Sequence, residues 1–294
     1  MLNLLFAGAL LVPSADSLLI SPAWLAAHQA DADLVVVEVA MDRDAYDRGH
    51  LPGARWLNPH LLIKDGPPGT ELPSVERIDS VLESLGINDR SRIVYYGDTW
   101  MTPRVFLALE YVGLGDHASL LDGGLPAWRE EKRALVSDVP NWIRGHLTRR
   151  PPHPEIVVEQ SWLRAHLDDA ALVLIDGRSP GEYAGTDHSE QLPRFGHIPG
   201  AANLPWEQTF TREAAALDGT PSRLKSPEAL RKLLASAGVR EGSDLVTYCT
   251  IGLRASHLYF IARYLGLHPR IYDGSMSEWS RKPELPMATG PSPR

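Results

Sequence analysis

The sequence predicts an α/β protein made of two similar domains, each with a mainly parallel sheet flanked by helices. Three observations lead to this prediction: the length of the chain, a duplicated set of motifs, and the alternation of strand and helix patterns. The 294 residues are enough for about two domains of roughly 150 residues each. Hydrophobic residues make up 44% of the chain and charged residues 22%, so each half can bury a core of its own.

The chain repeats itself once, because four motifs of the first half return in the same order in the second half. They are Gly-His-Leu-Pro-Gly-Ala at 49–54 and Gly-His-Ile-Pro-Gly-Ala at 196–201, Trp-Leu at 24–25 and 162–163, the apolar runs 93–97 and 245–249, and Asp-Gly with a following Trp at 122–128 and 273–279. An ordered set of this kind indicates a duplicated domain, since its period is far longer than that of a solenoid repeat.

Strand and helix patterns alternate within each half. Short continuous apolar runs predict strands buried on both faces, at 34–37, 93–96, 172–175 and 245–248. Helical patterns with start or stop signals cover 74–85, 226–237 and 256–265. The alternation predicts a parallel sheet covered on both sides in each domain.

The domain boundaries follow from these patterns and from composition. We expect a first domain without a thiol at 18–136 and a second, catalytic domain at 155–286. A Pro- and Arg-rich stretch at 137–154 is the expected linker, and 287–294 is the expected C-terminal tail.

The first 17 residues hold an apolar run at 4–12 that is too short to cross a bilayer. They form either an N-terminal extension or a signal segment, although no Lys or Arg stands near Met1. We expect a cytoplasmic protein, with export as the alternative if 1–17 act as a signal.

Charge and cysteine content exclude several classes of protein. The net charge of -8 argues against a general binder of nucleic acids or anionic membranes, because no broad positive field attracts phosphates. The single cysteine, Cys249, excludes an intramolecular disulfide, a Cys-x-x-Cys redox pair and a multi-cysteine zinc site. We expect no metal, no organic cofactor, and no nucleic-acid or membrane partner. The oligomeric state is left open.

Cys249 stands at the end of a predicted buried strand and just before a predicted helix. Ligands of parallel sheets bind at this edge, and the amides of a short loop and a helix start would lower the pKa of the thiol. Gly252 fits a backbone angle that most residues avoid, and Arg254 would cap the loop or bind an anion. The alternative is that Cys249 is a small buried hydrophobe. The matching loop of the first half, Gly-Asp-Thr-Trp at 97–100, has no cysteine.

These motifs resemble the tandem-domain rhodanese family of thiosulfate/3-mercaptopyruvate sulfurtransferases. The resemblance covers roughly residues 18–285, and its motifs are Asp-Gly-Arg at 176–178, Glu-Tyr at 182–183, Gly-His-Ile-Pro-Gly-Ala at 196–201, the loop 249–254 and Tyr-Asp-Gly-Ser at 272–275. It implies that Cys249 accepts sulfur from a small donor such as thiosulfate as a persulfide. Cyanide or a thiol then accepts that sulfur, with Thr250, Ile251, Gly252, Leu253 and Arg254 forming the loop around it.

The loop departs from the family in ways that bear on the donor. Ile251 lacks the serine hydroxyl proposed to assist 3-mercaptopyruvate cleavage, and Thr250 lacks the positive charge typical of thiosulfate-type members. Glu182 stands where the family has a substrate-binding arginine, and Arg194 or Arg254 would have to replace it. Thiosulfate is the favoured donor, with 3-mercaptopyruvate as the alternative.

Four further residues are candidates for supporting roles. Asp176 and Arg178 predict an ion pair at a strand end. His50 would act only if the first domain faces the cleft, and Trp100 lies in the loop without a thiol.

Two other classes of function compete with a sulfurtransferase. A cysteine phosphatase or arsenate reductase uses a similar loop, but its arginine comes six residues after the cysteine, where this chain has Ala255. A non-enzymatic sulfur-carrier or binding module is the second alternative, which Glu182 and Thr250 favour.

Overall fold

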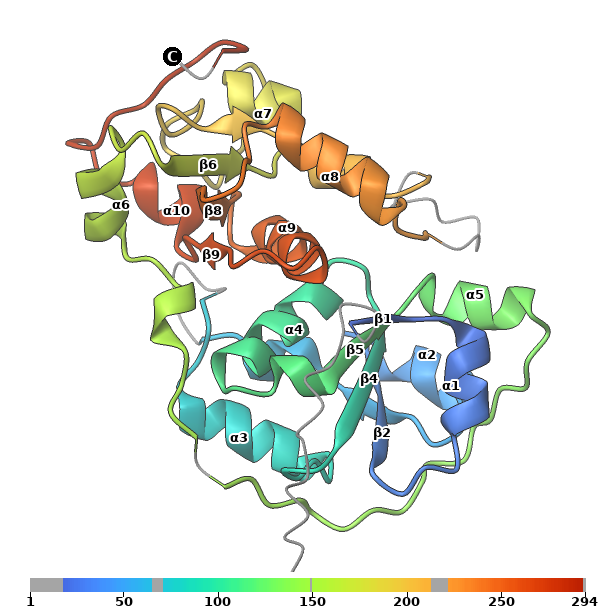
Figure 1. Ribbon diagram of the computed structural model, residues 1–294. Helices are drawn as coiled ribbons and strands as arrows, with labels where there is room; N and C mark the ends of the chain where they lie inside the picture. The colour runs from blue at the N-terminus through green and yellow to red at the C-terminus, as the bar shows by residue number, and fades with distance from the viewer. Residues whose placement is uncertain (1–17, 65–70, 149, 213–221, 293–294) are drawn as a thin grey trace, which may run out of the picture.

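The computed structural model describes residues 18–64, 71–148, 150–212 and 222–292. The segment 1–17, with its expected role as an extension or signal, lies outside the described residues. In Figure 1 the N-terminal domain lies below and the C-terminal domain above, with α4 and α9 between their sheets.

The first domain is built on a five-stranded sheet in which each neighbouring pair is parallel, with the order β1-β5-β4-β2-β3. Its strands are β1 (Leu19–Ile20), β2 (Leu34–Val39), β3 (Arg55–Leu57), β4 (Arg92–Gly97) and β5 (Ala118–Leu121). Its helices are α1 (Pro22–His28), α2 (Arg43–Arg48), α3 (Val75–Ser84), α4 (Thr102–Tyr111) and α5 (Gly124–Glu130), with 3-10 turns η2 (Pro59–Leu62) and η3 (Gly115–His117). Both faces are covered, because Val35 packs into the cluster that holds the buried side chains of α3 and α4, and Val36 into that of α1, α2 and α5.

The second domain repeats this plan with a four-stranded parallel sheet in the order β7-β6-β8-β9. Its strands are β6 (Leu172–Asp176), β7 (Ala202–Asn203), β8 (Asp244–Tyr248) and β9 (Arg270–Ile271). Its helices are α6 (Gln160–His166), α7 (Pro180–Ala184), α8 (Pro227–Ser236), α9 (Leu253–Tyr264) and α10 (Ser275–Trp279), with 3-10 turns η4 (Pro154–Ile156) and η5 (Trp206–Thr209). The two-domain α/β prediction is confirmed.

The helix starts follow from their caps. The side chains of Ser74 and Ser226 accept hydrogen bonds from the backbone of the first turns of α3 and α8, as N-cap residues do. The prediction that a helix begins at 256 was wrong. α9 begins at Leu253, because Gly252 takes a left-handed conformation (φ +90°) and serves as its N-cap. Leu253 and Arg254 therefore belong to the helix.

The two domains share one hydrophobic core, which continues from the α3/α4 face of the first sheet to the α8/α9 face of the second. α4 packs on α9, and the ring of Phe106 meets that of Phe260 edge-on at 5.0 Å between centroids. At the rim of this contact, Glu110 Oε2 lies 2.9 Å from Arg263 Nε. The loop after β8 leads directly into α9 and therefore lies at the domain interface.

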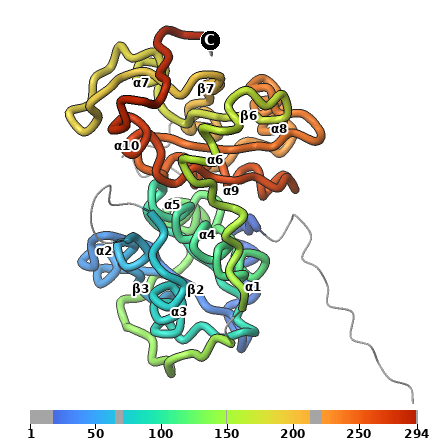
Figure 2. The backbone as a smooth tube through the Cα atoms, turned by 90° about the vertical axis from the view of Figure 1, so that its left-hand side faces the viewer, coloured from blue at the N-terminus to red at the C-terminus, as the bar shows by residue number. Residues whose placement is uncertain are grey.

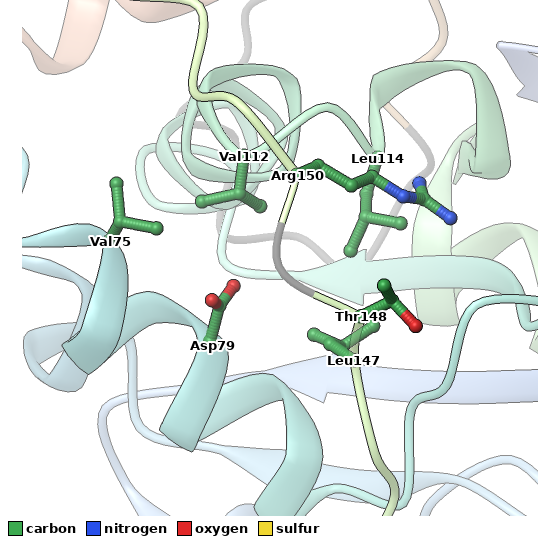
Figure 3. Close-up of a pocket in the computed structure, with 7 residues that line it drawn as sticks. All are labelled: Val75, Asp79, Val112, Leu114, Leu147, Thr148 and Arg150. Atoms are coloured by element: carbon green, nitrogen blue, oxygen red, sulfur yellow. The ribbon is translucent and has the colours of Figure 1, made fainter.

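The stretch expected to be a linker runs along the outside of the first domain before it reaches α6 (Figures 1 and 2). Trp142 donates its indole N–H to Ser84 O at 2.8 Å, and Gly145 N–H donates to Glu83 O at 2.8 Å. Figure 3 shows Leu147, Thr148 and Arg150 of this stretch beside α3 and the end of α4, around a hollow of about 10 Å³. That space is about one water molecule in size, and the hydrogen bonds show that the stretch packs against the first domain.

Candidate active site

Cys249 directly follows β8, whose neighbours in the sheet are β6 and β9. It therefore lies at the carboxyl end of a central parallel strand, as the sequence predicts. The loop from Cys249 to Gly252 is only four residues long, because α9 starts immediately after it.

The sulfur atom accepts a hydrogen bond from the main chain of its own loop. The N–H of Gly252 donates to Cys249 Sγ at 3.1 Å. Gly252 is also the N-cap of the 12-residue helix α9, whose start carries partial positive charge. Both features place partial positive charge beside the sulfur.

The side chain of Cys249 is fully buried, with 0% exposure, and belongs to the core shared by the two domains. The thiol lies at the predicted end of the strand, and in the structure it is enclosed there.

The start of α10 supports the loop from the other side. The N–H groups of Met276 and Ser277 donate to the carbonyl oxygens of Cys249 (3.0 Å) and Thr250 (2.9 Å). Cys249 N–H donates to Ser275 Oγ at 3.2 Å. Ser275 has φ +52°, an uncommon conformation for a residue with a side chain, and its hydroxyl donates to Tyr272 O at 3.0 Å. These bonds fix the backbone on which the sulfur sits.

Glu182, Thr250 and Arg254 form a closed set of hydrogen bonds on one side of the loop. Arg254 Nη1 donates to Glu182 Oε2 at 2.6 Å and Nη2 donates to Oε1 at 2.8 Å. Thr250 Oγ1 lies 3.1 Å from Glu182 Oε1 and 2.6 Å from Arg254 Nη2. Burial alone would raise the pKa of Glu182, but the bonds and charge of Arg254 outweigh it and lower that pKa to about 2. The carboxylate is therefore ionised at neutral pH.

Another ion pair lies next to Gly252, and this one joins the two domains. Arg104 of α4 donates to both carboxylate oxygens of Asp273, and Leu72 N–H donates to Oδ2 of the same carboxylate at 2.9 Å. A Cβ atom on Gly252 would lie 2.7 Å from Asp273 Oδ1, so only glycine fits there. The first domain thus contributes a buried arginine to the surroundings of the loop.

Comparison with known proteins decides the family. Rhodanese-like domains match two stretches of the chain, residues 21–131 and 159–282. The chain belongs to the rhodanese family. The prediction of a tandem-domain rhodanese from the motifs is confirmed.

Curated relatives of this rhodanese are named for sulfur transfer. It is 35% identical over 292 residues to the sulfur carrier protein TtuD of Thermus thermophilus, with 92% of this chain and 96% of the relative covered. It is 31% identical over 277 residues to the thiosulfate sulfurtransferase of Pseudomonas aeruginosa, with 92% and 96% covered.

Solved structures share the fold of this rhodanese. YnjE matches with a TM-score of 0.80 at 24% identity, over 93% of this chain and 68% of the other. EanB in complex with ergothioneine matches with a TM-score of 0.79 at 23% identity, over 95% and 72%.

The structure contradicts the suggestion that Arg194 binds substrate. Its guanidinium donates to the backbone carbonyls of Ser280 (2.9 Å) and Leu285 (2.8 Å), and also to those of Trp279 and Lys282. An arginine that satisfies the carbonyls at the end of a helix has few donors left for an anion. Arg194 is a cap for α10 in this rhodanese.

The structure also contradicts a role for His50 at the cleft. His50 is fully buried, its Nδ1 lies 2.8 Å from Tyr46 O, and its ring stacks on that of Tyr46 at 3.8 Å. His197 repeats this arrangement with Tyr183 in the second domain, at 2.8 Å and 3.7 Å. The same packing in both copies explains the repeated histidine as a structural residue.

The remaining candidates lie at the sheet end or the interface. Asp176 and Arg178 form the expected ion pair, at 2.6 Å, and Arg178 also donates to Gly196 O at 2.7 Å. Trp100 packs across the interface on Trp206, with 4.7 Å between ring centroids. Ile251 is partly buried against the shared core, which suits an apolar side chain.

Sequence reasoning missed Arg104 and gave Asp273 and Ser275 no role beyond their motif. The signal for Arg104 was weak: it is an arginine near the start of a mostly apolar helix, in the copy without a thiol. Its partner lies 169 residues away in the chain.

Neither a metal centre nor a membrane span is found in the described part of the chain. There, no group of three or more His, Cys, Asp and Glu side chains is arranged to hold a metal ion. No helix there is long and apolar enough to cross a membrane.

Proposed function

We propose that this rhodanese is a thiosulfate sulfurtransferase that carries sulfane sulfur as a persulfide on Cys249. The observation that carries the proposal is the hydrogen bond from Gly252 N–H to Cys249 Sγ at 3.1 Å, at the start of α9. An N–H group that points at the sulfur stabilises the negative charge of the thiolate before sulfur transfer and that of the persulfide after it. The relative named thiosulfate sulfurtransferase, at 31% identity, supports the choice of donor.

The reaction consists of two displacements at sulfur. In the first, the Cys249 thiolate attacks the outer sulfur of thiosulfate, the S–S bond of thiosulfate breaks, and sulfite leaves with the bonding pair. In the second, cyanide or a thiolate attacks the outer sulfur of the persulfide, the new S–S bond breaks, and the Cys249 thiolate is restored. The products are thiocyanate or an acceptor persulfide. Donor and acceptor supply all the atoms and electrons of this scheme.

The burial of Cys249 adds one requirement to this scheme. Because Sγ has no solvent exposure, the loop or its cover opens before the donor enters. Enclosure would then shield the persulfide from water and unintended thiols between the two steps.

A sulfur carrier is the second candidate, favoured by the pairing of Arg254 with Glu182. The pair cancels the charge of Arg254, which weakens a site for small anions and favours delivery to a larger partner. The relative named sulfur carrier protein, at 35% identity, supports this candidate. A carrier would accept one sulfur atom per chain and pass it to cyanide slowly.

The experiment is a thiocyanate assay with purified protein, thiosulfate and cyanide, run beside Cys249→Ser and Cys249→Ala. The proposal predicts many turnovers for the wild-type chain and none above background for either variant. One equivalent of sulfur uptake without turnover would favour the carrier. Release of phosphate from an aryl phosphate without thiocyanate formation would overturn both candidates in favour of a phosphatase.

A further inference from the structure

We propose that Glu182 determines which charge this protein prefers in its sulfur donor. Glu182 neutralises Arg254, and the site therefore selects against doubly charged anions. The inference rests on the proposed persulfide function and deepens it. It makes Glu182 a specificity-determining residue: thiosulfate is accepted, but less well than a singly charged sulfane donor of equal reactivity.

Glu182 and Arg254 form a two-point ion pair. Both oxygens of the Glu182 carboxylate face both terminal nitrogens of Arg254, at 2.6 and 2.8 Å. This two-point arrangement uses the same pair of N–H donors that would otherwise bind two oxygens of an anion. The side chains are 22% and 13% exposed, so solvent screens their charges only in part.

Thr250 connects this pair to the reacting loop. Its hydroxyl oxygen lies within hydrogen-bond distance of both Glu182 Oε1 and Arg254 Nη2, and its neighbour in the chain is Cys249. The charge of Cys249 also acts on Arg254. Burial alone would lower the pKa of Arg254. The hydrogen bonds to Glu182 and the interaction with the charge of Cys249 outweigh burial, and the pKa is raised above its usual value. A change in the charge of Glu182 is therefore felt where the donor binds.

The neighbouring basic residues do not compensate. Arg178 is held by Asp176 at 2.6 Å and Arg104 by Asp273 at 2.6 Å. Each of these three described arginines around the loop therefore has its own carboxylate, and together they add no net positive charge. The unfavourable interaction energy with Glu182 is twice as large for an incoming dianion as for a monoanion, because Coulomb energy is linear in charge.

Glu182 also has a structural role, which the test must separate from this one. It forms a capping box with Ser179: Glu182 N–H donates to Ser179 Oγ and Ser179 N–H donates to Glu182 Oε2, both at 3.2 Å. Glutamine supports a capping box as well as glutamate does. Glu182→Gln therefore removes the charge and keeps the cap, while Ser179→Ala removes the cap and keeps the charge.

The experiment compares kcat/KM for thiosulfate, a dianion, and benzenethiosulfonate, a monoanion, with cyanide as acceptor. We expect Glu182→Gln to raise kcat/KM about tenfold for thiosulfate and about threefold for benzenethiosulfonate, because the gain scales with donor charge. Both gains should shrink as salt is added. Ser179→Ala should leave the ratio between the two donors unchanged, and so should Glu228→Gln, which removes an equal charge from an exposed site.

Arg254→Gln gives the opposite test and covers the case in which Glu182→Gln does not fold. It leaves Glu182 without its counter-charge and should lower the ratio of thiosulfate to benzenethiosulfonate activity. Equal changes for the two donors in both variants, or a shift of the ratio by Ser179→Ala, would overturn the inference. A wild-type chain that forms no persulfide with either donor would instead overturn the proposed function, so the two failures are distinct.

Discussion

Arg104 of the first domain and Asp273 of the second form a two-point ion pair that is buried between the domains. Arg104 Nη1 lies 2.6 Å from Asp273 Oδ1, and Nη2 lies 2.9 Å from Oδ2. The same carboxylate oxygen Oδ1 would lie 2.7 Å from a Cβ atom on Gly252, whose N–H points at the sulfur of Cys249. The domain without a thiol therefore contributes a buried charge partner to the residue that lies against Gly252.

Arg104→Gln should destabilise the protein and slow sulfur transfer. The substitution leaves the Asp273 carboxylate buried without its counter-charge, and breaking a buried pair in this way typically costs about 3–5 kcal/mol of unfolding free energy. Urea denaturation measures this cost, and the thiocyanate assay under folded conditions measures the loss in kcat.

The double variant Arg104→Gln, Asp273→Asn should recover part of the stability, because it leaves no unpaired charge. Lys232→Gln is the matched surface control, since Lys232 pairs with Glu228 on exposed side chains and such pairs contribute about 0–1 kcal/mol. A loss for Arg104→Gln as small as that of Lys232→Gln would contradict the proposed role of the buried pair.

Gly252→Ala should impair the site more than its backbone angle alone explains. Both Gly252 (φ +90°) and Gly238 (φ +95°) have left-handed backbones, but a Cβ on Gly238 meets nothing within 4 Å. Gly238→Ala therefore measures the conformational cost, on the order of 1 kcal/mol. Gly252→Ala adds the clash with Asp273, and we expect a larger loss of stability together with at least a tenfold loss of kcat/KM. Equal effects of the two substitutions on stability and activity would show that the contact with Asp273 is unimportant.

Much of the fold was predictable from the sequence, because local patterns determine it. The apolar run 245–248 became β8, and Ser226 and Pro227 began α8 as predicted. The start of α9 was missed: the unusual backbone angle of Gly252 was predicted, but as part of a loop, whereas Gly252 is the N-cap of the helix and Leu253 and Arg254 belong to α9. Short strands such as β7 and β9, with two residues each, also escape prediction because tertiary pairing alone defines them.

The site was predictable only where it is local in sequence. Cys249, Gly252 and the strand before them are adjacent, so their position at a sheet end followed from the pattern. The pairing of Glu182 with Arg254 joins residues 72 positions apart, and that of Arg104 with Asp273 joins two domains. Arg194 and His50 were misjudged for the same reason, because their partners are backbone carbonyls, which leave no trace in residue identity.

His257 should make the protein less stable in mild acid. It is fully buried on α9, with Nε2 2.7 Å from Thr209 Oγ1, and burial lowers its pKa from 6.5 to about 3. The unfolded chain takes up a proton near pH 6.5 and the folded chain does not until near pH 3, so stability falls as pH drops through this window. The loss between pH 7.5 and pH 5 is about 2 kcal/mol, at roughly 1.4 kcal/mol per pH unit below 6.5.

Urea denaturation at the two pH values measures this dependence, with two variants as comparisons. His257→Gln should remove most of the difference, because glutamine does not titrate. His60→Gln changes an exposed histidine and should keep the wild-type difference. If His257→Gln retained the full dependence on pH, another group would be responsible for it.

The most direct test of the account is the intact mass of the protein after treatment with thiosulfate and removal of excess donor. A persulfide on Cys249 predicts a gain of about 32 Da, one sulfur atom, that disappears when cyanide is added. Cys249→Ser should show no gain under the same conditions. A wild-type mass that stays unchanged with thiosulfate, or a gain that persists in Cys249→Ser, would contradict the claim that this thiol carries the sulfur.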